Sequence, residues 1–152
     1  PSEELTEINL DRLIPEEISM FDNRDNIRFD YYCLKDSWIR GPKPQFTRVI
    51  VNLLTNAVQA IGEERQGHIV VSVRNSSTDG YYDIVVEDDG PGVKPENLDK
   101  LFTQNFTTKS SGSGLGLAIS RSILDRCGAT IEYGKSFALG GAAFTIKYPK
   151  LS

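Results

Sequence analysis

Two asparagines, Asn52 and Asn56, stand one helical turn apart inside a strongly apolar segment of the chain. Asn is a weak helix former, and a buried amide needs hydrogen-bond partners, so stability alone does not explain either residue. A single such Asn is typical of a surface position or a satisfied core amide. A pair on one helix face is different, because amide oxygens can ligate Mg²⁺, which keeps several waters and bridges phosphates. The pair therefore indicates a magnesium and phosphate site.

The second motif, Asp88-Asp89-Gly90-Pro91-Gly92, ends a predicted strand. A carboxylate such as that of Asp88 can accept a hydrogen bond from the exocyclic amine of adenine, while Gly90 and Gly92 let the backbone approach the base without a Cβ in between. The alternative is that the Asp-Asp-Gly triplet at 88–90 is an ordinary strand-ending turn, as most isolated triplets of this kind are. A calcium loop is excluded, because its first ligand position would fall on the apolar Val85.

A glycine-rich run opens a predicted helix and consists of Gly112, Ser113, Gly114, Leu115 and Gly116. Successive backbone N–H groups and the positive end of a helix form an anion site suited to phosphates. A dinucleotide-binding loop would follow a strand with GxGxxG spacing, whereas this run follows a polar segment with GxGxG spacing. The P-loop pattern GxxxxGK[ST] does not occur, so the motif differs from both of these phosphate loops.

Aromatic and basic residues precede the glycine run. Phe102 and Phe106 are both candidate ATP-binding residues. Phe102 is also expected to pack in the core, whereas Phe106 lies in a polar stretch and has a reason to be apolar if it docks against the pocket. Lys109 is either a solvated lysine or a charge that reaches the phosphates. His68 is the single histidine, and its place at a strand start predicts an inert surface residue and not a phosphate acceptor.

The elements that must position these residues follow from periodicity. The segment 45–63 has the apolar spacing of a helix with one buried face, and Asn52, Asn56 and Gln59 lie on the polar strip beside that face. Segments 68–74 and 81–88 predict an antiparallel hairpin. Further helices are expected at 8–21, 95–102 and 114–126, further strands at 27–33, 38–40, 130–133 and 143–148, and a mobile loop at 103–113. The expected fold class is α+β, a two-layer sandwich of a mixed, mostly antiparallel sheet with helices on one face.

The length of 152 residues suits a single domain, 1–152, and the 17 basic against 21 acidic residues give a net charge of −4. This balance offers no broad basic face for nucleic acid. Cys33 and Cys127 are far apart and predict buried, reduced thiols of a cytoplasmic protein. The chain starts without Met, which predicts a piece of a longer protein whose parent can still be anchored in the inner membrane.

Four blocks, NLLTNAVQAI, EDDGPGV, LFTQNFTTK and GSGLGLAIS, occur in this order from Asn52 onwards. They resemble the N, G1, F and G2 boxes of the catalytic ATP-binding domain of sensor histidine kinases, which belong to the Bergerat-fold ATPases. The resemblance covers nearly the whole chain and includes the closing GGAAF and YP motifs. The wording of NAVQAI and FTTK is closest to the nitrogen-regulation type of kinase.

The resemblance implies the roles of individual residues. Asn52 and Asn56 would hold Mg²⁺ and phosphates, Asp88 would bind the adenine amine, and Thr108 and Lys109 would belong to a lid over ATP. Two departures matter. Many members carry Lys or Arg where this chain has Gln59, and Ala142 and Ala143 lack the hydroxyl that several relatives have near adenine.

One position distinguishes activities within the superfamily. Hydrolysing relatives place a Glu, the general base for water, where this chain has Asn52, and an amide cannot take up a proton. The resemblance therefore implies a kinase that binds ATP or ADP as an isolated monomer and passes phosphate to a histidine on a helical dimerisation domain of a homodimeric parent, upstream of a response regulator. The alternatives are an ATPase clamp and a degenerate nucleotide-binding module.

Overall fold

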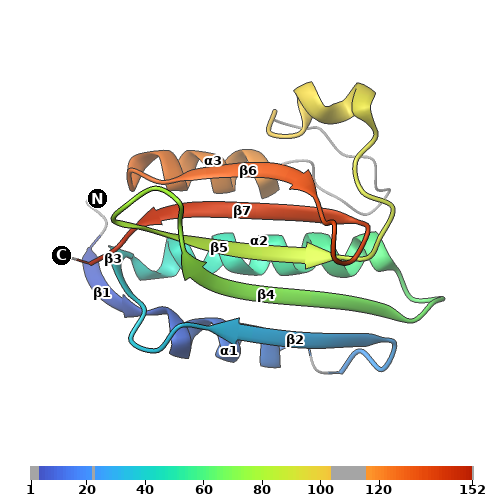
Figure 1. Ribbon diagram of the computed structural model, residues 1–152, viewed down its shortest axis with the longest axis horizontal. Coiled ribbons are helices and arrows are strands. Elements are labelled where there is room, and N and C mark those ends of the chain that lie inside the picture. The colour runs from blue at the N-terminus through green and yellow to red at the C-terminus, as the bar shows by residue number, and fades with distance from the viewer. Residues whose placement is uncertain (1–3, 22, 104–115, 152) are drawn as a thin grey trace.

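The computed structural model describes residues 4–21, 23–103 and 116–151. Figure 1 shows these residues as one layer of strands and one layer of helices. The elements are β1 (Leu5–Asn9), α1 (Leu10–Ser19), β2 (Ile27–Cys33), β3 (Trp38–Pro42), α2 (Lys43–Ile61), β4 (Gly67–Asn75), β5 (Tyr81–Asp88), a short 3-10 helix (Pro95–Lys100), α3 (Gly116–Arg126), β6 (Thr130–Lys135) and β7 (Ala142–Pro149).

The main sheet has five strands in the order β2-β4-β5-β7-β6. Strands β2 and β4 are parallel, and every other neighbouring pair in this sheet is antiparallel. Strands β1 and β3 form a separate antiparallel pair at the end of the molecule where both termini lie (Figure 1). The predicted class, a mixed and mostly antiparallel sheet in an α+β sandwich, is confirmed.

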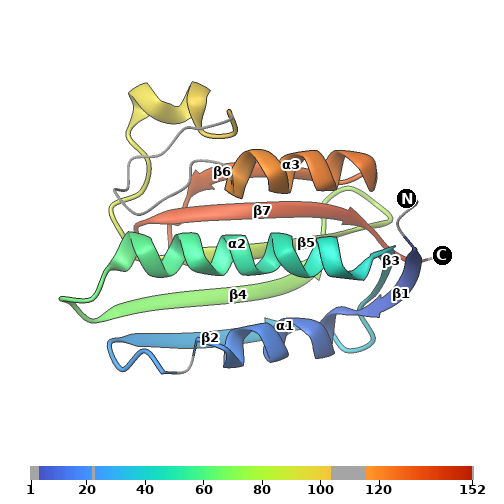
Figure 2. The same ribbon diagram turned by 180° about the vertical axis from the view of Figure 1, so that it is seen from behind.

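All three α-helices cover the same face of the main sheet (Figure 2). Helix α2 lies centrally because its apolar residues recur at helical spacing and form one continuous buried face. The buried residues of α2 are Phe46, Val49, Ile50, Leu53, Leu54, Ala57, Val58 and Ile61. The ring of Phe46 meets that of Tyr148 on β7 edge to face, with 5.5 Å between ring centroids. This packing holds α2 over the middle of the sheet and so places its asparagines relative to the strand ends.

The start of the first helix differs from the prediction. Ile8 belongs to strand β1, where it pairs with Ile39, and the helix begins only at Leu10. Asn9 caps the helix, because its side-chain oxygen accepts a hydrogen bond from the backbone N–H of Asp11 at 3.0 Å. Ile8 is buried like the helix residues that follow it, so its hydrophobicity alone does not distinguish the strand from the helix.

The remaining predicted elements agree with the structure in position, with small shifts at their ends. The segment expected as a helix at 95–102 is a 3-10 helix of six residues, and α3 is described from Gly116 onwards. Cys33 and Cys127 are free thiols, as predicted, but both are partly exposed, so the expectation that they are buried was wrong. No helix in the described part of the chain is long and apolar enough to cross a membrane.

Candidate nucleotide-binding site

Asp88 is the last residue of β5 and lies at the end of the sheet opposite the chain termini (Figure 1). Its side chain is buried, with 1% of the residue exposed. One carboxylate oxygen, Oδ1, accepts hydrogen bonds from the backbone N–H groups of Gly90 at 2.9 Å and Ala142 at 3.3 Å. These bonds come from the turn after β5 and from the start of β7, so two segments far apart in sequence orient the carboxylate.

Gly141 lies against this carboxylate more closely than any other residue type could. A Cβ added to Gly141 would be 2.5 Å from both the backbone oxygen and Oδ1 of Asp88, and 2.7 Å from the backbone nitrogen of Gly90. These distances are shorter than real Cβ contacts, and the atoms concerned are backbone or buried. Position 141 therefore requires glycine so that the backbone before β7 can reach Asp88.

Gly90 and Gly92 are the two glycines predicted to shape the base pocket, and glycine suits each position for a different physical reason. A Cβ on Gly90 would be 3.0 Å from the Cβ of Ala60 on α2, so Gly90 lets the turn pack closely against that helix. Gly92 has a φ of 75°, a conformation that favours glycine, and the hydroxyl of Tyr133 lies 3.2 Å from where its Cβ would be. That hydroxyl accepts a hydrogen bond from the backbone N–H of Val93 at 3.0 Å. Both glycines therefore fix the path of the chain after Asp88.

Asn52 connects helices α2 and α3. Its Nδ2 donates hydrogen bonds to the backbone oxygen of Gly116 and to Oγ of Ser120, both at 3.3 Å. Ser120 is fully buried, so these bonds lie inside the contact between the two helices. The predicted magnesium ligand thus also fixes the described start of α3, where the glycine-rich run ends.

The other predicted residues of α2 lie on the same side as Asn52 or near it. Asn56 is half-buried one turn further along the helix, while Gln59 is exposed. Among the described residues, no three His, Cys, Asp or Glu side chains gather as a metal site. A divalent ion here would therefore depend on amide oxygens and phosphate oxygens, a donor set that Mg²⁺ accepts and the two asparagines fit.

Several predicted site residues lie outside the described residues, namely Phe106, Thr108, Lys109, Gly112, Ser113, Gly114 and Leu115. Most of the loop predicted at 103–113 lies there as well. Phe102 is described and packs as expected, with its ring edge to face with that of Phe144 on β7 at 6.3 Å between centroids. The guanidinium of Arg121 on α3 lies over the same ring at 5.5 Å from its centroid. Phe102 thus joins the sheet to α3.

The polar contacts of Asp89, the residue after Asp88, were not predicted from the sequence. Arg65 donates to the backbone oxygen of Asp89 at 2.7 Å and to its carboxylate at 2.9 Å, and the backbone N–H of His68 donates to the same carboxylate oxygen at 3.1 Å. Burial alone would raise the pKa of Asp89, but these hydrogen bonds and the Arg65 charge together lower it below its ordinary value of 3.8. The ionised Asp89 therefore anchors the strand end beside Asp88.

His68 is partly buried, and its Nε2 lies 2.6 Å from a carboxylate oxygen of Asp30 on the neighbouring strand β2. The Nε of Arg28 lies 3.1 Å from the same oxygen. This environment gives His68 a local partner within the sheet. Its predicted inert role stays a prediction.

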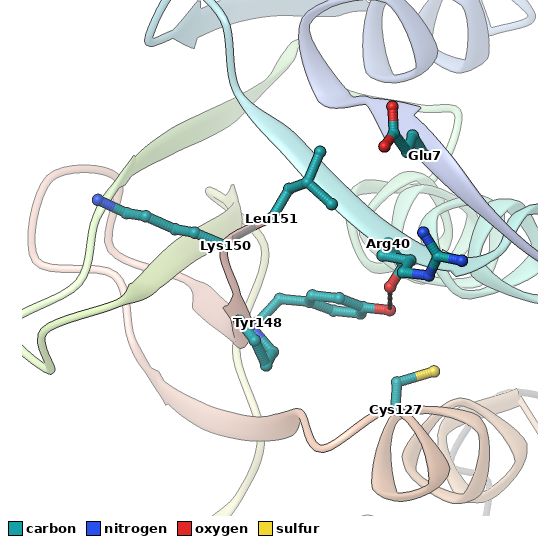
Figure 3. Close-up of a pocket in the computed structure, with 7 residues that line it drawn as sticks. Glu7, Arg40, Cys127, Tyr148, Lys150 and Leu151 are labelled. Atoms are coloured by element: carbon teal, nitrogen blue, oxygen red, sulfur yellow. Dashed lines mark hydrogen bonds between the residues drawn. The ribbon is translucent and has the colours of Figure 1, made fainter.

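A cavity of about 320 Å³ lies at the other end of the molecule, where its lining includes residues 149–151 near the carboxyl terminus. Figure 3 shows the side chains that line it. Its lining includes Arg40, Cys127 and Tyr148, and the Tyr148 hydroxyl donates to the backbone oxygen of Arg40 at 2.9 Å. None of the residues predicted to bind nucleotide lines this cavity. The cavity is lined from β1, β3, β7 and the residue that follows α3, and it is separate from the site around Asp88.

Comparison with known proteins assigns the family. The family model described as "Histidine kinase-, DNA gyrase B-, and HSP90-like ATPase" matches residues 41–152, which include the described residues of the site. The chain belongs to this family. The chain is also 42% identical over 114 residues to the sensor histidine kinase ZraS of Salmonella typhi, a match that covers 75% of this chain and 24% of that protein. It therefore spans about a quarter of the length of this curated relative.

Solved structures of histidine kinases share the fold of this family member. The nucleotide-free catalytic domain of histidine kinase ThkA superposes with a TM-score of 0.86 at 32% identity, over 97% of this chain and 96% of that one. Histidine kinase ThkA in complex with response regulator protein TrrA gives a TM-score of 0.80 at 28% identity, over 97% of this chain and 42% of that one. The two-layer architecture is therefore that of a histidine kinase catalytic domain.

Proposed function

We propose that residues 1–152 form the catalytic ATP-binding domain of a sensor histidine kinase, which binds Mg-ATP and donates the γ-phosphate to a histidine on a separate helical domain of its parent protein. The observation that carries this proposal is the buried Asp88 carboxylate, oriented by the backbone of two loops at the end of the sheet. Membership of the histidine kinase-like ATPase family supports it.

Asp88 is suited to select adenine. A carboxylate is an acceptor only, so it pairs with the exocyclic amine of adenine and disfavours the carbonyl oxygen that guanine carries at the same position. The short contacts of Gly141 with Asp88 leave no side chain at this point, so a flat base can lie against backbone. Hydrogen bonds to a charged acceptor contribute about 1.5–3 kcal/mol each, enough to determine which base is bound.

The phosphate end of the nucleotide belongs, in this proposal, to α2 and to the segment before α3. Asn52 and Asn56 present amides one turn apart, and Asn52 is hydrogen-bonded to Gly116 at the described start of α3. We assign the phosphates to the Gly112–Gly116 run and assign Thr108 and Lys109 to a lid. Mg²⁺, when bound, neutralises phosphate charge and orients the γ-phosphate for in-line transfer. The asparagines would hold it through their amide oxygens.

Asn52 also favours transfer over hydrolysis. Its Nδ2 donates to two acceptors on α3, the Gly116 carbonyl and the Ser120 hydroxyl. An ionised Glu at this position could not donate to the carbonyl, so the helix contact seen here requires a hydrogen-bond donor, which the amide of Asn52 supplies. Since an amide does not take up a proton, position 52 supplies no general base for water. ATP would then stay intact until a histidine arrives.

The partners follow from the proposed reaction. The phosphate acceptor would be a histidine on the dimerisation domain of a homodimeric parent, and a response regulator would receive the phosphate next. The complex of histidine kinase ThkA with response regulator protein TrrA supports a partner of this class. We also propose that the isolated chain is monomeric, that it lies in the cytoplasm, and that it binds no nucleic acid.

The test is phosphoryl transfer in trans. The chain is incubated with radiolabelled Mg-ATP, with and without the histidine-bearing helical domain of the same parent protein. We expect label on that domain, no label on the chain itself, and no steady release of phosphate by the chain alone. Asn56→Asp should abolish transfer, because it changes the charge and the ligand at the magnesium position. The His68→Ala variant should transfer label to the helical domain as efficiently as the wild type does.

Each other outcome contradicts the proposal in a specific way. Steady ATP turnover by the chain alone would identify an ATPase clamp. Tight ATP binding without transfer to the matched helical domain would identify a nucleotide-binding module. Label on the chain that disappears with His68→Ala would make His68 an acceptor, against the role predicted for it.

A further inference from the structure

Ser136 is a buried polar residue in the connection between β6 and β7, with 1% of its surface exposed. Its hydroxyl donates to a carboxylate oxygen of Glu87 at 3.0 Å and accepts from the backbone N–H of Leu139 at 3.1 Å. Glu87 precedes Asp88 on β5. The hydroxyl therefore ties the β6–β7 connection to the strand that carries the proposed base-binding carboxylate.

The backbone of Ser136 closes the same connection. Its N–H donates to the oxygen of Gly141 at 2.7 Å, and its oxygen accepts from the N–H of Gly140 at 2.7 Å. Gly141 is the residue that lies against Asp88, and the N–H of Ala142 next to it donates to Asp88 Oδ1. A short path of hydrogen bonds thus leads from Ser136 to the carboxylate.

We propose that Ser136 is a positioning residue for base recognition: it fixes the 136–141 connection so that Gly141 and the Ala142 amide orient the Asp88 carboxylate toward the exocyclic amine of adenine. This proposal rests on the proposed function. Alanine at 136 keeps the two backbone bonds but loses the hydroxyl, which leaves the Leu139 N–H without its acceptor and Glu87 without its donor. A connection released from β5 can move away, and the Ala142 amide moves with it.

The chain offers a matched control in Ser72 on β4. Ser72 is also buried, at 9% exposure, but its hydroxyl has no hydrogen-bond partner among the described residues. Ser72→Ala therefore removes a buried hydroxyl from the same sheet without breaking a bond. Glu87→Ala, at a half-buried position, is a second route to the same break should Ser136→Ala fold poorly.

The experiment is a calorimetric titration with Mg-ADP and with Mg-IDP, which share sugar and phosphates but differ at the exocyclic group that Asp88 would bind. We expect wild type to prefer ADP. Ser136→Ala should raise the Kd for ADP about tenfold, which corresponds to about 1.4 kcal/mol, and the Kd for IDP by less than about threefold. Ser136→Thr keeps the hydroxyl and should retain most of the preference for Mg-ADP over Mg-IDP. Ser72→Ala should retain all of that preference. Glu87→Ala should reproduce the selective loss.

The outcomes separate the two proposals. No binding of either nucleotide to wild type overturns the proposed function. Wild-type preference for ADP that survives both Ser136→Ala and Glu87→Ala overturns the role of Ser136. Equal weakening of ADP and IDP by Ser136→Ala also overturns it, because the residue would then support the structure in general and not the reading of the amine.

Discussion

The substitution Gly141→Ala tests the close approach of the backbone to Asp88. The new Cβ would lie 2.5 Å from two oxygens of Asp88 and 2.7 Å from the nitrogen of Gly90, so the backbone must move by about 0.9 Å to restore ordinary contact at 3.4 Å. Inserting a methyl group into a packed site costs about 1–3 kcal/mol. For a chain of this length, each kcal/mol lowers the Tm by about 2–4 °C, so we expect a Tm about 2–12 °C below wild type.

The same movement should weaken nucleotide binding. If Asp88 loses its hydrogen bond to the base, about 1.5–3 kcal/mol of binding free energy disappears, and the Kd for Mg-ADP rises about 10- to 100-fold. The matched control is Gly134→Ala on β6, where no heavy atom of the described residues lies within 4 Å of the added Cβ and φ is outside the left-handed region, as it is at Gly141. Gly134→Ala should leave the Kd within about twofold of wild type.

The assay combines thermal melts with calorimetric titration of Mg-ADP, carried out well below the Tm of each variant so that only folded protein is titrated. The two alanine variants differ in steric surroundings and not in residue chemistry. A Gly141→Ala protein that binds ADP as tightly as Gly134→Ala would refute the argument that this backbone contact shapes the site.

Three further predictions follow from the same geometry. Asn52→Asp places a carboxylate against the Gly116 carbonyl in place of a donor, so thermal melts should show a loss of about 1–3 kcal/mol in the free energy of unfolding. The pKa of Asp89 is lowered in the fold, so its stabilising effect is complete above the ordinary value of 3.8 and is lost as the pH falls through the folded value. Urea unfolding measured between about pH 5 and 2.5 should therefore show that the free energy of unfolding falls less with decreasing pH in Asp89→Asn than in wild type. Mg-ADP at a hundredfold excess over its Kd should stabilise the chain by about 2.7 kcal/mol, measured as a rise in Tm of about 5–10 °C; an unchanged melt would exclude a nucleotide site.

The sequence predicts well those elements whose periodicity is long and regular. Helix α2 was expected because its apolar residues repeat over five turns, and its place against the sheet follows from that face. Strand β1 was missed, because it has only five residues and its partner β3 lies about thirty residues away. The cap residue Asn9, directly before the first buried helix position, is the feature that could have separated strand from helix.

The candidate site likewise has features that the sequence predicts and features that it does not. The types and spacing of Asn52, Asp88 and the glycines indicated nucleotide chemistry because these features occur together in one chain, whereas each of them alone is also typical of ordinary structural positions. The contact of Gly141 with Asp88 joins residues 53 positions apart, and its reason is steric closeness that no local pattern encodes. The hydrogen bond from Asn52 to Ser120 spans 68 positions and gives the predicted ligand a second, structural role.

Titration of Asp88→Asn with Mg-ADP tests the central claim most directly. The substitution keeps the size of the side chain and an oxygen that can accept from Gly90 and Ala142, but it removes the charge that would attract the adenine amine. We expect a fold with wild-type melting behaviour within a few degrees and a Kd about 10- to 100-fold higher. An Asp88→Asn protein that folds and binds Mg-ADP as tightly as wild type would show that Asp88 is only a turn residue and would contradict the account.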